Sequence, residues 1–282
     1  MDTDFTNSKL NNVTLENTIF VNPIFTNADL IGLNLSNKPL TRVSFRGAKL
    51  KDTIFTGADL TGSDLTNADL TGKDLTNTNL TDAILNNSTL KGCTLSRTNL
   101  TNTKLEGVDL KGLNLINVVF HATKLQNADL RGLNFSNKDL IAVDFRDAKL
   151  RDTILTGAFL RFANFQGANL EGGNITYATF KDANLTNANL RGLNLEDLDL
   201  IGAILIGANL EGVNLKKNNL TNANLTNTDL TKSILIGTIF HGATLKGTNF
   251  TGMNLKKLPL KNVSLKDSIL ENTVLPSYYK VL

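Results

Sequence analysis

The sequence predicts an all-β solenoid built from one five-residue unit that repeats along almost the whole chain. Every residue whose number is a multiple of five, from Phe5 to Leu275, is Leu, Phe or Ile. We call these residues the centres. Neither an α-helix nor a simple strand has a period of five, so the pattern indicates a repeat architecture in which neighbouring units share one core.

Two further columns of the repeat explain how each unit is built. The residue two before a centre, which we call the inner slot, is mostly Ala, Ser, Thr or Val. In extended backbone this residue and the centre point the same way, so one small and one large side chain face inward. The residue two after a centre, which we call the corner, is mostly Gly, Asn or Asp, types that tolerate a positive φ. Each pentad therefore predicts one short extended side followed by one turn.

The words ADLTGSDLTNADLTGKDL (58–75) and ANLTNANLRGLNL (183–195) resemble the A(D/N)LXX motif of pentapeptide-repeat proteins. The resemblance extends over residues 1–275. It implies a right-handed quadrilateral parallel β-helix, in which four pentads form one square coil of 20 residues. The chain would then contain about fourteen such coils.

A 20-residue period is also visible within the sequence itself. Inner slots that hold oversized residues fall on only two of the four sides of such a coil: Leu33, Lys73, Leu113, Leu133, Leu193 and Met253 on one, and Lys38, Lys138, Leu198 and Leu258 on the next. A near-copy of segment 31–58 begins one hundred residues later, at 131, which keeps both copies on the same sides of the coil. Buried lysines in these slots should turn outward or bulge the corner, because an unpaired ammonium is costly to bury.

The pentads run without interruption, which predicts one domain over residues 1–275 and a C-terminal cap or tail over 276–282. A stack of β-coils exposes an open core and unpaired edges at its end unless something covers them. Tyr278 and Tyr279 are the candidates to seal the core or to contact a second subunit. Relatives in the family dimerise end to end, so the resemblance also suggests an end-to-end homodimer.

The sequence offers no catalytic constellation, and we expect neither an enzyme nor a bound metal or cofactor. His121 and His241 share one column but are separated by six coils, too far apart to act together. Cys93 occupies an inner slot, where a buried and inert thiol is the default. The glycines recur as turn residues and form no phosphate-binding loop.

Two surface irregularities are candidate partner-binding sites. The C-terminal part of the chain is rich in lysine, including Lys216, Lys217, Lys256, Lys257 and Lys261. This cluster would suit an acidic partner, although a solvated surface is the alternative. Phe159, Phe162 and Tyr177 occupy outward columns, and exposed apolar clusters often mark protein contacts. No aromatic residues are interleaved with the lysines, which argues against sequence-specific nucleic-acid binding.

Composition narrows the functional class further. The net charge of the 282 residues is +3, so no strongly charged partner is implied, and no apolar run is long enough to span a membrane. The N-terminus lacks the apolar core of a secretory signal and Cys93 is the sole cysteine, which together favour a cytoplasmic location.

The function that the sequence favours is a non-enzymatic, rigid solenoid that binds one or more proteins as a scaffold, spacer or structural component. The alternative is an inhibitor or protector that docks on a nucleic-acid enzyme such as DNA gyrase. The quinolone-resistance members of the family are acidic rods that mimic DNA. This chain is similar to them in fold only, because it is slightly basic and lacks the loops that interrupt their coils.

Overall fold

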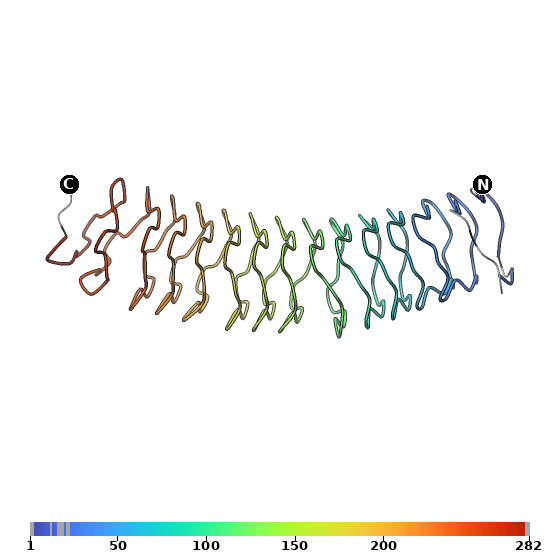
Figure 1. The fold of residues 1–282 in the computed structure, drawn as a ribbon, viewed down its shortest axis with the longest axis horizontal. Coiled ribbons are helices and arrows are strands. Elements are labelled where there is room, and N and C mark those ends of the chain that lie inside the picture. Colours follow the sequence, from blue (N-terminus) through green and yellow to red (C-terminus); the bar gives the residue numbers. More distant parts are fainter. Residues whose placement is uncertain (1–2, 12, 16–19, 21–22, 280–282) are drawn as a thin grey trace. The chain divides into compact units, whose positions relative to one another are not determined.

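The computed structural model describes residues 3–11, 13–15, 20 and 23–279. These residues form two compact units, Met1–Leu133 and Asn134–Leu282. The described residues contain no helix and no strand longer than a single bridged residue. Instead, the pentads have two turn residues followed by a three-residue extended side (Figure 1), and in most of them the middle residue of that side makes a bridge, although Asn114, Pro259 and Ser264 make none.

All bridges are parallel and join residues 20 apart, which confirms the 20-residue coil and the β-helix fold. Within unit 1, one such column runs from Ile24 through Ser44, Asp64 and Ile84 to Lys104. Within unit 2, an equivalent column runs through Asn164, Asn184, Ile204 and Asn224. Four sides make one coil. We refer to the side centred on residues 15, 35, 55 and every twentieth residue thereafter as side A, and to the next side, centred on 20, 40, 60 and so on, as side B.

Backbone hydrogen bonding explains why five residues form the repeating unit. In a regular pentad, all five N–H groups find an acceptor. The first, third and fifth donate to carbonyls of adjacent coils, the fourth closes the turn onto its own centre, and the second donates to the side chain of the residue before the centre. The N–H groups of pentad 185–189 donate in order to Ile204 O, Asn184 Oδ1, Ile206 O, Leu185 O and Ala168 O, at 2.6, 3.0, 2.8, 3.0 and 2.9 Å. No donor is left without a partner, as buried backbone requires.

This hydrogen-bonding pattern explains two columns of the sequence. Asn or Asp precedes the centre because its side-chain oxygen accepts the N–H two residues on, for which the turn provides no other partner. The corner residues from Asn27 to Asn272 have φ between 53° and 75°, at Gly as at other types, with Lys257 as the exception. Of the chain's 21 glycines, only Gly173 lies outside this column, in an inner slot.

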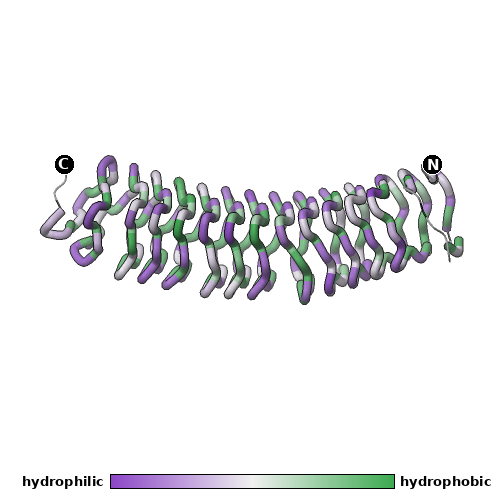
Figure 2. The backbone as a smooth tube through the Cα atoms, viewed as in Figure 1, coloured by the Kyte–Doolittle hydropathy of each residue, from purple (hydrophilic) through white to green (hydrophobic). Residues whose placement is uncertain are grey.

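The centres form the core of each unit. Leu and Phe side chains at these positions are almost all buried, and phenylalanines 20 residues apart stack on one another. Phe25 and Phe45 lie 5.6 Å apart in unit 1, and Phe145 and Phe165 lie 4.8 Å apart in unit 2. Figure 2 shows the resulting alternation of hydrophobic and hydrophilic residues along every coil.

Hydroxyl side chains in the inner slots add a second hydrogen-bonded ladder. Most donate to the carbonyl of the centre 23 residues earlier, in the preceding coil, whereas Thr153 and Thr228 donate to the centre three residues earlier. Thr53 Oγ1 bonds Leu30 O at 2.8 Å, and Cys93 Sγ lies 2.9 Å from Leu70 O in the same way. Lys38 follows the same pattern, since its Nζ lies 2.8 Å from Leu15 O and thereby gains a partner without leaving the slot. Slot side chains therefore lean toward the preceding coil.

Because of this lean, the size of the slot residue decides whether side A closes. Where the slot is small, the side bridges to the preceding coil: Thr53, Cys93, Thr153, Gly173, Val213, Ser233 and Thr273. Where it is large, that bridge is missing among the described residues: Leu33, Lys73, Leu113, Leu193 and Met253. The bridge to the following coil is kept beside Leu33, Lys73, Leu193 and Met253, whereas Asn114, next to Leu113, makes no bridge to either neighbour in the described structure. In those four cases the oversized side chain overfills its layer and displaces only the coil toward which it leans.

Lys73 combines this opening with a buried charge. Its side chain is buried, and burial lowers the pKa of the ammonium, while Asp52 and Asp69 act in the opposite direction. A cleft of about 380 Å³ lies in front of it, between the coil sides that contain residues 48–52 and 69–73. An oversized polar residue therefore opens the ladder just as an apolar one does.

We predict that Thr53→Leu opens side A between Asn34 and Ile54. The variant loses the hydroxyl bond to Leu30 and overfills the slot, so the unfolding free energy should fall by about 1–3 kcal/mol. Hydrogen exchange at the Ile54 amide, which donates to Leu33 O at 3.0 Å, should accelerate. Thr53→Val is the matched control because it keeps the slot small; an equally fast Ile54 amide in that variant would contradict the size rule.

Candidate functional site

The eight residues that the sequence suggested for partner binding all border side B of unit 2. Phe159 lies on this side, at the position bridged to Thr179 of the next coil. The corner before the side carries Tyr177 and, two and four coils later in sequence register, the pairs Lys216–Lys217 and Lys256–Lys257. The corner after it carries Phe162 and, further on, Lys261. The structure thus assigns to one side of the coil two clusters that the sequence treated separately.

The three aromatic residues are well exposed. The exposed fractions are 84% for Tyr177, 53% for Phe162 and 52% for Phe159. The ladder beneath them is intact, since residues 159, 164, 169 and 179 all bridge to their neighbours. Side chains on this ladder are held in fixed relative positions, as a binding surface requires.

Tyr177 and Phe162 occupy corners, where both have φ of 60°. The left-handed conformation costs a non-glycine residue about 1–2 kcal/mol, and bulky types gain nothing there to offset it. These two are the sole aromatic residues among the described corners with positive φ. The Arg161 guanidinium lies 4.4 Å from the Phe162 ring centroid and pairs with Asp182, which holds the ring in place.

The lysines differ in how free their charges are. Lys216 Nζ lies 2.8 Å from a carboxylate oxygen of Glu196, and this bond lowers the pKa of Glu196. The charge of Lys216 is therefore already balanced by a carboxylate of the same chain. Within the described residues, Lys256, Lys257 and Lys261 make no ion pair. Lys217 makes no ion pair in the described structure either, but its charge helps to lower the pKa of Glu196, so Lys256, Lys257 and Lys261 are the better placed of the five to contact an acidic group.

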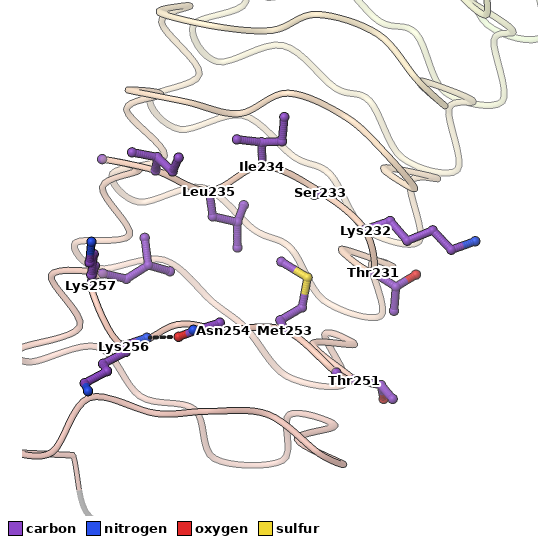
Figure 3. Close-up of a pocket in the computed structure, with 14 residues that line it drawn as sticks. Thr231, Lys232, Ser233, Ile234, Leu235, Thr251, Met253, Asn254, Lys256 and Lys257 are labelled. Carbon is purple, nitrogen blue, oxygen red and sulfur yellow. Dashed lines mark hydrogen bonds between the residues drawn. The ribbon is translucent and has the colours of Figure 1, made fainter.

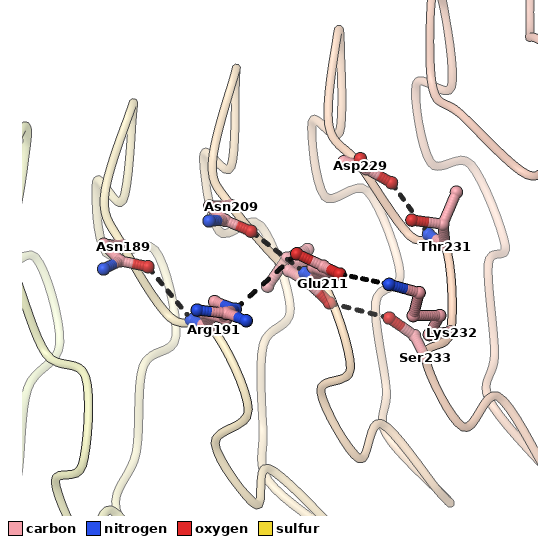
Figure 4. A network of polar contacts seen from close by, with 9 residues as sticks. Asn189, Arg191, Asn209, Glu211, Asp229, Thr231, Lys232 and Ser233 are labelled. Atoms are coloured by element: carbon pink, nitrogen blue, oxygen red, sulfur yellow. Dashed lines mark hydrogen bonds and ion pairs between the residues drawn. The ribbon is translucent and has the colours of Figure 1, made fainter.

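The corner that precedes side A carries a network of ion pairs. Glu211 lies 3.6 Å from Arg191 and 2.7 Å from Lys232, which belong to the coils on either side of it (Figure 4). The hydrogen bond from Lys232 is the main reason that the pKa of Glu211 is lowered. Both cations therefore share one carboxylate, and each already has an ion-pair partner within this chain.

Tyr278 and Tyr279 cover the free edge of the last coil. The Tyr278 hydroxyl accepts the Leu260 N–H at 3.1 Å and donates to Leu258 O at 2.9 Å. The Tyr279 hydroxyl does the same for Leu265 N–H and Val263 O, at 2.8 and 3.0 Å. In the interior of the stack these backbone groups bond to the next coil, so each hydroxyl replaces one donor and one acceptor of a missing peptide unit.

A cleft on side A of unit 2 was not predicted from the sequence. It has a volume of about 820 Å³ and lies between residues 231–237 of one coil and 251–258 of the next (Figure 3). Leu235 and Met253 point into it from its two walls. Met253 is one of the oversized slot residues, and Leu258 and Pro259 follow on side B. The large size of these residues could have indicated the cleft, but we did not infer from the sequence that they would interrupt the hydrogen-bond ladder.

The remaining candidates for chemistry are isolated. Within the described part of the chain, no group of three or more His, Cys, Asp or Glu could hold a metal ion. His121 belongs to unit 1 and His241 to unit 2. Cys93 is buried, and burial raises the pKa of its thiol to about 11. None of the described residues forms a helix long and apolar enough to cross a bilayer.

Comparison with known sequences identifies the family. The family model described as pentapeptide repeats matches residues 1–37, 40–77, 144–182, 178–217 and 219–252, and a related model, pentapeptide repeat region, matches 63–134. The chain belongs to the pentapeptide-repeat family. No curated protein matches this pentapeptide-repeat chain.

Solved structures with similar sequences include three other pentapeptide-repeat proteins. HetL, involved in heterocyst differentiation regulation in the cyanobacterium Nostoc sp. strain PCC 7120, is 25% identical over 87% of this chain and 89% of its own, with a TM-score of 0.26. QnrB1, a plasmid-mediated fluoroquinolone resistance protein, is 18% identical over 78% and 92%, with a TM-score of 0.31. Rfr23 from the cyanobacterium Cyanothece 51142 is 25% identical over 59% and 90%, with a TM-score of 0.21.

We predict that replacing both terminal tyrosines of this pentapeptide-repeat protein, Tyr278→Phe with Tyr279→Phe, frays its last coil. Each hydroxyl satisfies two backbone groups, so the pair should lower the unfolding free energy by about 1–3 kcal/mol. Exchange of the Leu260 and Leu265 amides should accelerate, as measured by hydrogen exchange with mass spectrometry. Tyr177→Phe is the control. Unchanged exchange at both amides would show that the hydroxyls do not cap the edge.

We also predict that Cys93 is inert in the folded protein. Its raised pKa leaves almost no thiolate at pH 8, and its Sγ faces Leu70 O within the core. Labelling by a disulfide reagent at pH 8 should be at least about a hundredfold slower than for free cysteine, and should reach completion after denaturation. Rapid labelling of the native protein would contradict this description of the slot.

Proposed function

We propose that this protein is a non-enzymatic, protein-binding solenoid that presents side B of unit 2 to a partner. One observation carries the proposal: the chain places the aromatic side chains of Phe162 and Tyr177 at two corners where the backbone conformation costs energy, although more than half of each residue stays exposed. Residues held in unfavourable backbone conformations are typical of functional positions. Aromatic side chains are also the types that contribute most to binding at protein interfaces.

The chemistry of side B indicates what kind of partner would fit. Phe159, Phe162 and Tyr177 provide an apolar centre, and Tyr177 adds a phenol that can hydrogen-bond at a partly wet interface. The uncompensated charges of Lys256, Lys257 and Lys261 lie further along the same side. A partner with an apolar patch flanked by acidic residues would complement both features. The fixed coil would then act as a scaffold or spacer.

The test replaces the three aromatic residues with the asparagine that the repeat normally carries at such positions. Phe159→Asn, Phe162→Asn and Tyr177→Asn together should abolish capture of the partner from an extract of the native source, by at least about tenfold. Because Asn tolerates positive φ better than Phe or Tyr, the thermal midpoint should rise or stay level. Lost capture with preserved stability separates a binding role from a structural one.

Ile204→Asn is the matched control, since Ile204 is an exposed residue in the same column on another side of unit 2. It should leave capture unchanged. Equal capture by the triple variant and the wild type would refute the proposal. Inhibition of DNA supercoiling by gyrase that survives in the triple variant would favour the nucleic-acid-enzyme alternative instead.

A further inference from the structure

We infer that the cleft on side A of unit 2 is an insertion site for a short, acidic peptide in extended conformation. The cleft exists because two adjacent coils have lost their backbone ladder. Among the described residues, no backbone bond joins Lys232–Lys246 to the side of the next coil, although the same coils are joined at Leu230 and again at Gly247. The opening is therefore a local gap with closed ends.

The two walls keep the backbone groups that the ladder would have used. In the regular register, the N–H groups of Lys232, Leu235 and Gly237 would donate to the next coil, and Asn254 N–H would donate back to Ser233 O. All four bonds are missing from this part of the described structure. The cleft is thus lined by donors and acceptors, alternating at the spacing of a parallel strand. A peptide strand supplies both kinds of partner, whereas an aliphatic acid has no donor for the exposed carbonyls.

Both walls are firmly held from behind. On one side, Ile234 N–H donates to Val213 O at 2.9 Å, and Lys217 N–H donates to Ile236 O at 2.9 Å. On the other, Leu255 N–H donates to Val274 O at 2.7 Å, and Val274 N–H donates to Met253 O at 2.9 Å. A ligand in the cleft therefore meets two rigid strand edges and pays little to order them.

The side chains define the sequence that would fit. Leu235, Met253 and Leu258 make the interior of the cleft apolar, so one large apolar residue can enter as a centre does. Lys256 and Lys257 lie at one end, where Figure 3 shows them beside the opening. Lys232, at the other end, is already paired with Glu211. The charge that remains favours acidic residues on the peptide near Lys256 and Lys257.

Met253 keeps the cleft open, and this gives a direct test. A small slot residue on side A accompanies a bridge to the preceding coil, and threonine adds a hydroxyl bond to the centre 23 residues earlier. Met253→Thr should therefore join Ile234 to Asn254 and close the gap on side A. Leu193→Thr is the matched control, because it makes the same kind of change on the same side three coils earlier.

The probe is a fluorescein-labelled, end-capped peptide of sequence Glu-Ala-Asp-Leu-Glu, titrated with the full chain in a fluorescence anisotropy assay. We expect saturable binding to the wild type and to Leu193→Thr. Binding should weaken at least about tenfold in Met253→Thr, and by a similar factor when both Lys256 and Lys257 are changed to Gln. The same peptide with N-methylated Asp and Leu should also bind at least about tenfold more weakly.

The proposal is overturned if Met253→Thr binds as the wild type does, or if N-methylation has no effect, because either result removes the strand edges from the interaction. It is equally overturned if dodecanoate binds the cleft and the peptide does not. The lysine variant and the modified peptide keep the test decisive if Met253→Thr fails to fold. The inference does not depend on the aromatic residues of side B, so the Phe159, Phe162 and Tyr177 variant should bind the peptide normally.

Discussion

The bond from each backbone N–H to an acceptor one coil away is the interaction on which every other feature of this protein depends. Three of the five N–H groups in a pentad donate to carbonyls of adjacent coils, and the other two donate within their own coil and shape the turn. Cohesion between coils is therefore largely independent of side-chain identity. The sequence must supply only a large centre, a small slot, an amide or carboxylate before the centre and a corner that accepts positive φ. The outward side chains are left free to vary.

The inner slot is where this scheme becomes sensitive to single residues. Its side chain leans toward the preceding coil, so it either ties that coil down through a hydroxyl or pushes it away through excess volume. Thr53 and Met253 represent the two outcomes. The fold tolerates the second at Met253 because the following coil stays bonded, which confines that opening to one interface. A residue in the core can therefore shape the outer surface without disturbing the rest of the stack.

The period of five, the centres, the corners and the 20-residue coil could all be predicted from the sequence, because each follows from a repeated steric or conformational requirement. The ladder openings could not. The 20-residue period predicts that Leu193 and Met253 lie on the same side of the coil. The direction in which a slot side chain leans, however, depends on the backbone geometry. The pairing of Lys216 with Glu196 was accessible in principle, since the two are one coil apart in sequence. The role of the two tyrosine hydroxyls depends on which backbone groups they contact in space, and the repeat pattern does not predict those contacts.

The tyrosine cap has a consequence for how such a chain can change its length. Two phenol oxygens at the C-terminal end stand in for a coil that is not there, so new coils cannot simply be appended beyond them without undoing that seal. Insertion of whole 20-residue coils within the repeat leaves the tyrosine hydrogen bonds in place and keeps every side of the coil in register. The similar segments 31–58 and 131–158, displaced by a whole number of coils, are what such internal growth would leave behind.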